Sequence, residues 1–171
     1  TMAVAPASIS KKASDVFTME ITIDTGENQV VAAELHITLD QTKLEAQTIT
    51  NGSLFPNILA SGTVEPGGAS ITVGAADAKQ PVRGTGTVAT VKFLAKEKTD
   101  SPSSIKLGSN SFVGGLGEGA TNVLAGTTPA SVTITKDVVQ HTPTPTPTPM
   151  PTVIPTSTTT PSTESAQLSQ T

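Results

Sequence analysis

Strict alternation of apolar and polar residues is the feature that most constrains the fold of this chain. From residue 17 to residue 24, Phe, Met and two Ile take every second position, and Thr, Glu and Asp fill the positions between them. Successive side chains of a β-strand point to opposite faces, so this period of two predicts a strand with one buried face. The same pattern returns over residues 33–40, after the turn-forming residues 25–28. We therefore expect sheets that are apolar on one side.

The rest of the chain up to residue 137 also favours strands. Further strands are predicted over residues 43–50, 69–76, 85–96, 104–107 and 130–136. Gly or Pro interrupts most stretches that could otherwise form a helix, and the Gly-rich residues 114–119 are expected to form a loop. Short strands at regular spacing are typical of two packed sheets. The prediction is an all-β fold, an antiparallel β-sandwich with jelly-roll topology and about nine strands, over residues 8–137.

The alternation also predicts which side chains fill the core. The expected core residues are Phe17, Met19, Ile21, Ile23, Leu35, Ile37, Leu39, Leu44, Ile71, Val73, Val91, Phe93, Val132 and Ile134. The chain has four Phe and no Trp or Tyr, so only Phe55 and Phe112 are left as aromatic residues for the surface.

The two ends of the chain differ in composition from this domain. Residues 138–171 contain eleven Thr, seven Pro and four Ser, which predicts a disordered, extended linker with no core of its own. Residues 1–7 are small and apolar and are expected to form an N-terminal extension, either frayed or derived from a secretory signal.

Composition excludes several classes of function. The formal net charge is −4, which argues against binding nucleic acid, because a nucleic-acid surface must neutralise phosphates. The absence of Cys removes disulfides and thiolate chemistry. No apolar run approaches the length of about 18 residues that spans a bilayer, so we expect no membrane insertion by these residues.

Residues typical of catalysis are scarce. Of the two His, His141 lies in the expected linker, and the alternation places His36 on the outward side of its strand with Glu34 and Thr38. The chain has no Gly-x-Ser-x-Gly motif and no Asp-rich calcium loop. We therefore predict that the domain is not an enzyme and binds no metal or cofactor.

Two polar positions leave alternatives open. Asp40 ends a predicted strand, where its carboxylate can accept a hydrogen bond from the turn that follows, and the alternative role is that of a metal ligand. Asn51, Gly52 and Ser53 form both a turn signal and a glycosylation acceptor triplet.

Three stretches of the chain are similar to parts of a known family. Residues 33–45 are similar to a family stretch that reads aromatic, Asp, Pro, two variable residues, Leu and Glu; Asp40, Leu44 and Glu45 fit, while Leu39 and Gln41 replace the aromatic residue and the Pro. Residues 86–96 are similar to the family's Gly-x-x-Ala-Thr-Ile-x-Phe strand, and residues 130–135 are similar to its closing strand. Together these stretches resemble the cohesin family of extracellular modules.

The resemblance implies a non-catalytic module that binds a dockerin-like partner through one sheet face, in assemblies that degrade polysaccharides. The implied face carries Glu34, His36 and Thr38, together with outward positions of residues 85–96. Glu34 replaces a shorter Asp of typical members, and Ala32 replaces an upstream Asn. Calcium is implied only in the partner, and the setting is extracellular or at the cell surface. The alternatives are a carbohydrate-binding module and a structural cell-surface or adhesion module without a dockerin partner.

Overall fold

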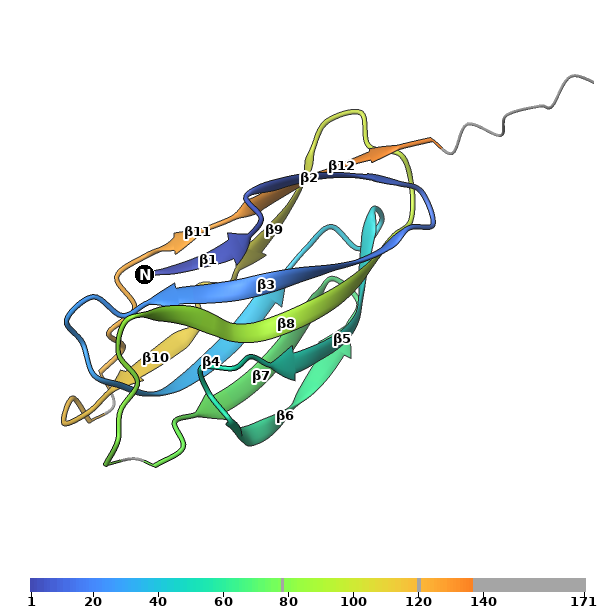
Figure 1. The fold of residues 1–171 in the computed structure, drawn as a ribbon. Coiled ribbons are helices and arrows are strands. Elements are labelled where there is room, and N and C mark those ends of the chain that lie inside the picture. The colour runs from blue at the N-terminus through green and yellow to red at the C-terminus, as the bar shows by residue number, and fades with distance from the viewer. Residues whose placement is uncertain (78, 120, 137–171) are drawn as a thin grey trace, which may run out of the picture. The chain divides into compact units, whose positions relative to one another are not determined.

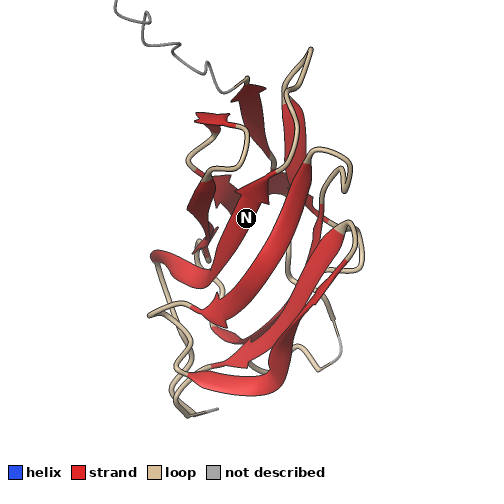
Figure 2. Ribbon diagram, turned by 90° about the vertical axis from the view of Figure 1, so that its right-hand side faces the viewer, coloured by secondary structure: helices blue, strands red, loops and turns tan. Residues whose placement is uncertain are grey.

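The computed structural model describes residues 1–77, 79–119 and 121–136, and the predicted linker over residues 138–171 lies outside the described residues. The described residues form twelve strands and no helix (Figures 1 and 2). The predicted all-β fold is confirmed, although the strands number twelve where about nine were expected.

The strands form two sheets. The five-stranded sheet has the order β11(Thr127–Thr128), β1(Met2–Ala5), β3(Val16–Asp24), β8(Thr85–Ala95) and β5(Leu44–Asn51). The seven-stranded sheet has the order β2(Ser8–Lys12), β12(Ala130–Thr135), β9(Ser103–Leu107), β4(Val30–Thr38), β7(Gly68–Gly74) and β6(Asn57–Glu65), with β10(Phe112–Gly115) paired to β4. Most pairings are antiparallel, but β1 pairs with β11 and β2 pairs with β12 in parallel, so both sheets are mixed and not purely antiparallel as predicted.

The alternating residues bury one side of each sheet in a shared core. All of the predicted core residues are buried except Leu39, which is partly buried and packs against the core. The rings of Phe17 and Phe93 lie on the paired strands β3 and β8, with their centroids 5.6 Å apart. The pattern in the sequence therefore predicted both the strand faces and the packing between the sheets.

The N-terminal residues are part of the domain and do not form the predicted extension over residues 1–7. Met2 and Val4 on β1 are almost completely buried, and β1 pairs with β3 on one side and with β11 on the other. After Pro6 the chain enters the other sheet, where β2 pairs with β12. Four residues before a Pro give too short a pattern to predict a strand, so only the tertiary pairing reveals β1.

The structure decides one open position and corrects one prediction. Phe55, which the sequence left available for the surface, is fully buried in the core. Gly114 and Gly115 were expected in a loop, but they form the end of strand β10 beside β4.

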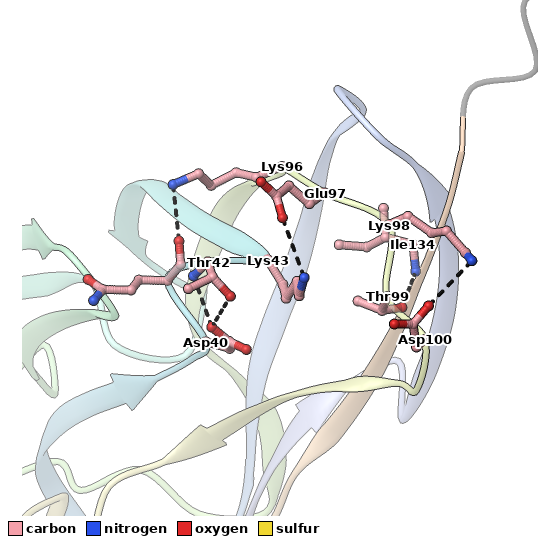
Figure 3. A network of polar contacts seen from close by, with 10 residues as sticks. Asp40, Thr42, Lys43, Lys96, Glu97, Lys98, Thr99, Asp100 and Ile134 are labelled. Atoms are coloured by element: carbon pink, nitrogen blue, oxygen red, sulfur yellow. Dashed lines mark hydrogen bonds and ion pairs between the residues drawn. The ribbon is translucent and has the colours of Figure 1, made fainter.

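Asp40 shapes the turn between β4 and β5. Its carboxylate Oδ1 accepts hydrogen bonds from the backbone nitrogen of Thr42 at 2.9 Å and from the Thr42 hydroxyl at 2.7 Å. Around the same turn, the Lys96 ammonium donates to the Gln41 carbonyl oxygen at 3.0 Å, and Lys43 pairs with Glu97 at 3.4 Å (Figure 3). These contacts support the structural interpretation of Asp40 as a turn residue.

Replacing Phe93 by Ala tests the core. We expect a loss of about 3–5 kcal/mol in the free energy of unfolding, because the substitution removes a buried ring and leaves a cavity. Thermal unfolding should show a melting temperature lower by about 10 °C or more. The control is Val16→Ala, at an exposed position of β3, which should change the melting temperature little. Equal melting of Phe93→Ala and the wild type would contradict the inward orientation of this ring.

Acid titration tests the Asp40 turn. The hydroxyl and the backbone nitrogen of Thr42 donate to the carboxylate and hold the pKa of Asp40 below its ordinary value of 3.8. A lowered pKa means that the ionised form stabilises the fold above the unfolded-state pKa, and that this contribution is lost as the pH falls through the folded-state pKa. Carbon-detected NMR titration should therefore give Asp40 a midpoint below the ordinary value. Thr42→Val should raise that midpoint, and an unchanged midpoint would exclude the hydroxyl as the main cause.

Candidate functional site

The outward side of the seven-stranded sheet around β4 brings together the three residues singled out by the sequence. Leu35 and Ile37 point into the core, so Glu34, His36 and Thr38 lie on the opposite side of β4. Strand β4 is flanked by β7 on one edge and by β9 and β10 on the other. We call this outward surface of β4, its flanking strands and β6 the β4 face.

A hydrogen-bonded pair of Glu34 and His36, which becomes an ion pair when the imidazole is protonated, lies at the centre of the β4 face. The Nε2 atom of His36 lies 2.8 Å from Oε1 of Glu34, and the two side chains remain 31% and 47% exposed. The strand register places Thr72 opposite Glu34 and Ser70 opposite His36 on β7. The centre of the face therefore presents a carboxylate, an imidazole and two hydroxyls, which can accept and donate hydrogen bonds to a partner.

The backbone beneath this ion pair is held by a buried serine. The Ser111 hydroxyl accepts a hydrogen bond from the backbone nitrogen of His36 at 3.1 Å and donates to the His36 carbonyl oxygen at 3.3 Å. Ser111 is 2% exposed and lies 75 residues further along the chain. This clamp connects the segment before β10 to β4, so the ion pair stands on a fixed backbone.

Strands β6 and β9 extend the polar row on both sides. The hydroxyls of Thr63 and Ser70 lie 2.9 Å apart across β6 and β7. On the other edge Lys106 of β9 is opposite Thr38, whose hydroxyl donates to the Lys106 carbonyl oxygen at 3.4 Å. Sequence reasoning missed these neighbours. The alternation in β7 could have indicated that Ser70 faces outward, but no local pattern predicts which strands lie beside β4.

The strand over residues 85–96 does not contribute to the β4 face, contrary to what the family resemblance implied. This segment forms β8, which pairs with β3 and β5 in the five-stranded sheet. Its inward residues include Val91 and Phe93, which pack in the core between the two sheets. Its outward residues therefore lie on the opposite side of the sandwich.

The structure also bears on the open alternatives for Asp40 and Asn51. Among the described residues, no group of three or more His, Cys, Asp or Glu is placed to hold a metal ion. The Nδ2 atom of Asn51 donates to the Phe55 carbonyl oxygen at 3.0 Å, which favours the turn interpretation.

Within the described residues, no helix has the length and apolar character needed to cross a membrane.

Comparison with solved structures reveals the same fold in cohesins. The non-cellulosomal cohesin of the hyperthermophilic archaeon Archaeoglobus fulgidus is 17% identical, with a TM-score of 0.62 over 79% of this chain and 90% of that chain. CaCohA2 from Clostridium acetobutylicum is 18% identical, with a TM-score of 0.64 over 79% of this chain and 91% of that chain. The third cohesin ScaC of Acetivibrio cellulolyticus, solved with the ScaB dockerin, is 20% identical, with a TM-score of 0.62 over 78% of this chain and 99% of that chain.

Sequence comparison identifies the family. No curated protein matches the chain. The family described as the cohesin domain matches residues 2–135, from the first residue of β1 to the last residue of β12. The boundaries of the match thus coincide with the two mixed sheets, including the N-terminal strands. The chain belongs to the cohesin family.

Proposed function

We propose that this cohesin domain is a protein-recognition module that binds a dockerin-like partner through the β4 face. The observation that carries the proposal is the Glu34–His36 ion pair, which stands partly exposed at the centre of a sheet whose other side is the core. The ScaC cohesin, which has the same fold, was solved in complex with a dockerin. Dockerin binding by this chain is the function that best fits its family and its surface.

The chemistry of the β4 face suits a protein partner. Glu34 offers a carboxylate oxygen that accepts strong hydrogen bonds from charged or neutral donors, and the sheet holds it without a flexible loop. Ser70 and Thr72 add hydroxyls that donate or accept as the partner requires. Hydrogen-bonding groups at the centre of an interface contribute most when the surrounding contacts exclude water.

The proposal includes a non-catalytic role. Cohesin domains are protein-interaction modules without catalytic activity. The hydrogen-bond partner of the His36 ring is the Glu34 carboxylate on the same open strand. This pair is well suited to recognition, whereas general base catalysis also needs a group whose proton the imidazole abstracts.

The proposed setting is extracellular or at the cell surface, within an assembly that degrades polysaccharides. The Thr/Pro-rich composition of residues 138–171 supports this setting, because such stretches are typical of spacers in secreted and surface proteins. We place the calcium required for binding in the dockerin-like partner and not in this domain.

No observation favours carbohydrate binding as a second function. Flat sugar-binding surfaces use exposed aromatic rings, and the sequence left only Phe55 and Phe112 for that role. Phe55 is in the core, so Phe112 remains as a single, half-buried ring.

Glu34→Ala is the substitution that tests the proposed function. Calcium-loaded dockerin modules encoded in the same genome would be titrated into the domain by calorimetry. We expect the variant to bind about tenfold more weakly or worse, because it leaves a donor of the partner without its acceptor. The melting temperature should change by no more than a degree or two, since Glu34 is exposed.

Glu45→Ala is the matched control, because Glu45 is an exposed carboxylate on β5 of the other sheet. It should bind like the wild type. Equal binding by Glu34→Ala would move the recognition surface away from the β4 face. If no dockerin bound the wild type in calcium, or if binding survived a calcium chelator, the proposed partner would be wrong, and a structural module would remain.

A further inference from the structure

The pairing of β4 with its neighbours is interrupted at His36, in the middle of the β4 face. On the edge of β4 away from β7, β10 pairs with residues 30–34 and β9 pairs with residues 37 and 38, so within the described sheet neither strand pairs with His36. A strand can bend or bulge where its ladder is interrupted, and a bulge turns side chains in another direction. Other contacts must therefore hold the backbone of His36 in line with the rest of β4.

The turn between β9 and β10 supplies these contacts. The backbone nitrogen of Gly108 donates to the His36 carbonyl oxygen at 2.6 Å. The Ser111 hydroxyl accepts a hydrogen bond from the His36 backbone nitrogen and donates to the same carbonyl oxygen. Both backbone groups of His36 are thus paired, although no strand residue lies opposite them on this side. One buried hydroxyl replaces the contacts that a neighbouring strand would make.

Asn122 in turn holds Ser111. Its Nδ2 atom donates to the Ser111 carbonyl oxygen at 3.0 Å. Its Oδ1 atom accepts hydrogen bonds from the backbone nitrogens of Val113 at 2.9 Å and Leu124 at 3.0 Å. Val113 belongs to β10, which pairs with β4. The side chain of Asn122 therefore ties Ser111 to the start of β10 and so to the strand that carries the recognition pair.

The contact between Glu34 and His36 depends on the backbone that joins them. The two residues are two positions apart on one strand, and the imidazole Nε2 atom can lie 2.8 Å from the carboxylate only while both side chains point to the same side. A bend or bulge at His36 would separate them. The hydrogen bonds of the Ser111 hydroxyl end on the backbone of His36, so this hydroxyl acts on the pair through the strand.

We propose that Ser111 and Asn122 are positioning residues for partner recognition, which hold His36 so that its imidazole stays on the Glu34 carboxylate. The inference rests on the proposed function and adds the groups that keep the recognition pair in one arrangement. A group that is already held in its bound arrangement loses less conformational freedom on binding. Removal of the Ser111 hydroxyl should therefore weaken binding, although Ser111 is 2% exposed and lies beneath the surface that a partner would contact.

Ser111→Ala tests the inference, with Thr99→Val as the matched control. The Thr99 hydroxyl accepts a hydrogen bond from the Ile134 backbone nitrogen at 3.0 Å, on β12, which β9 separates from β4 (Figure 3). Thr99 is also buried, so each variant removes one buried hydroxyl that holds a strand nitrogen. Both variants should lower the melting temperature by several degrees, because each leaves that nitrogen without its acceptor.

Calorimetric titration with the calcium-loaded dockerin modules encoded in the same genome should separate the two variants. At a temperature at which both are folded, Ser111→Ala should bind about fivefold more weakly or worse, and Thr99→Val should bind like the wild type. In a Glu34→Ala background, Ser111→Ala should weaken binding by less than about twofold further, because the carboxylate that holds the imidazole is absent. Equal losses in the two backgrounds would overturn the inference.

The nitrogen NMR spectrum of the His36 ring, recorded at one fixed pH, provides a readout without a partner. The ring signals of Ser111→Ala should move toward those of Glu34→Ala, because both variants lose the contact between the imidazole and the carboxylate. Asn122→Asp, at an exposed position, should move the signals in the same direction, since an oxygen replaces the donor to Ser111. Thr99→Val should leave them unchanged.

The outcomes separate this inference from the proposed function. If Glu34→Ala weakened dockerin binding while Ser111→Ala bound like Thr99→Val, the docking face would stand and the positioning role would be overturned. Unchanged ring signals in Ser111→Ala and Asn122→Asp would overturn the positioning role whether or not a partner binds. If no dockerin bound the wild type, the proposed function would fail, and the positioning role in recognition would fail with it.

Discussion

Burial of alternate side chains on β4 is the constraint on which both the fold and the candidate site depend. Leu35 and Ile37 are almost completely buried between the sheets, and their burial fixes which residues of β4 face outward. A slip of one residue in the register would expose both and place Glu34 and His36 in the core. Burying a carboxylate without new partners costs several kcal/mol, so the same apolar contacts that hold the sheets together also hold the Glu34–His36 pair at the surface.

Strands from the two ends of the domain pair with each other in both sheets. β1 pairs with β11 in one sheet and β2 pairs with β12 in the other, so the first two strands are held by the last two. A sheet edge that is left open presents unpaired backbone groups to solvent. β11 and β2 cover the outer edges of β1 and β12, whose inner edges pair with β3 and β9. The edge formed by β6 is different, because it is exposed over its whole length and broken by two bulges. The domain thus combines edge strands held by long-range pairing with one irregular edge beside the β4 face.

The alternation of apolar and polar residues predicted the strands that have one buried side. It did not predict strands whose residues lack this alternation. β3, β4 and β8 follow from their alternation, and with them the core around Phe17 and Phe93. β1 is too short for a pattern, β6 has no buried side, and β10 contains two glycines, so none of them carries the signal of a half-buried strand. For the site, alternation was enough to place Glu34, His36 and Thr38 on one face. It could not identify β7 and β9 as neighbours of β4, because pairing between strands distant in sequence depends on the whole fold.

Glycine at two positions of the β4 face determines how closely two apolar side chains approach the sheet. Glycine weakens a strand interior, since it adds no side-chain packing and loses more backbone entropy on folding than other residues. A Cβ atom at Gly74 would lie 3.0 Å from Cδ1 of Leu59, and one at Gly114 would lie 3.3 Å from Cε1 of Phe112, so a side chain at either position would force its neighbour to shift. The two glycines therefore allow Leu59 and Phe112 to lie close to the sheet, and Phe112 is opposite Glu34 in the register of β10 and β4.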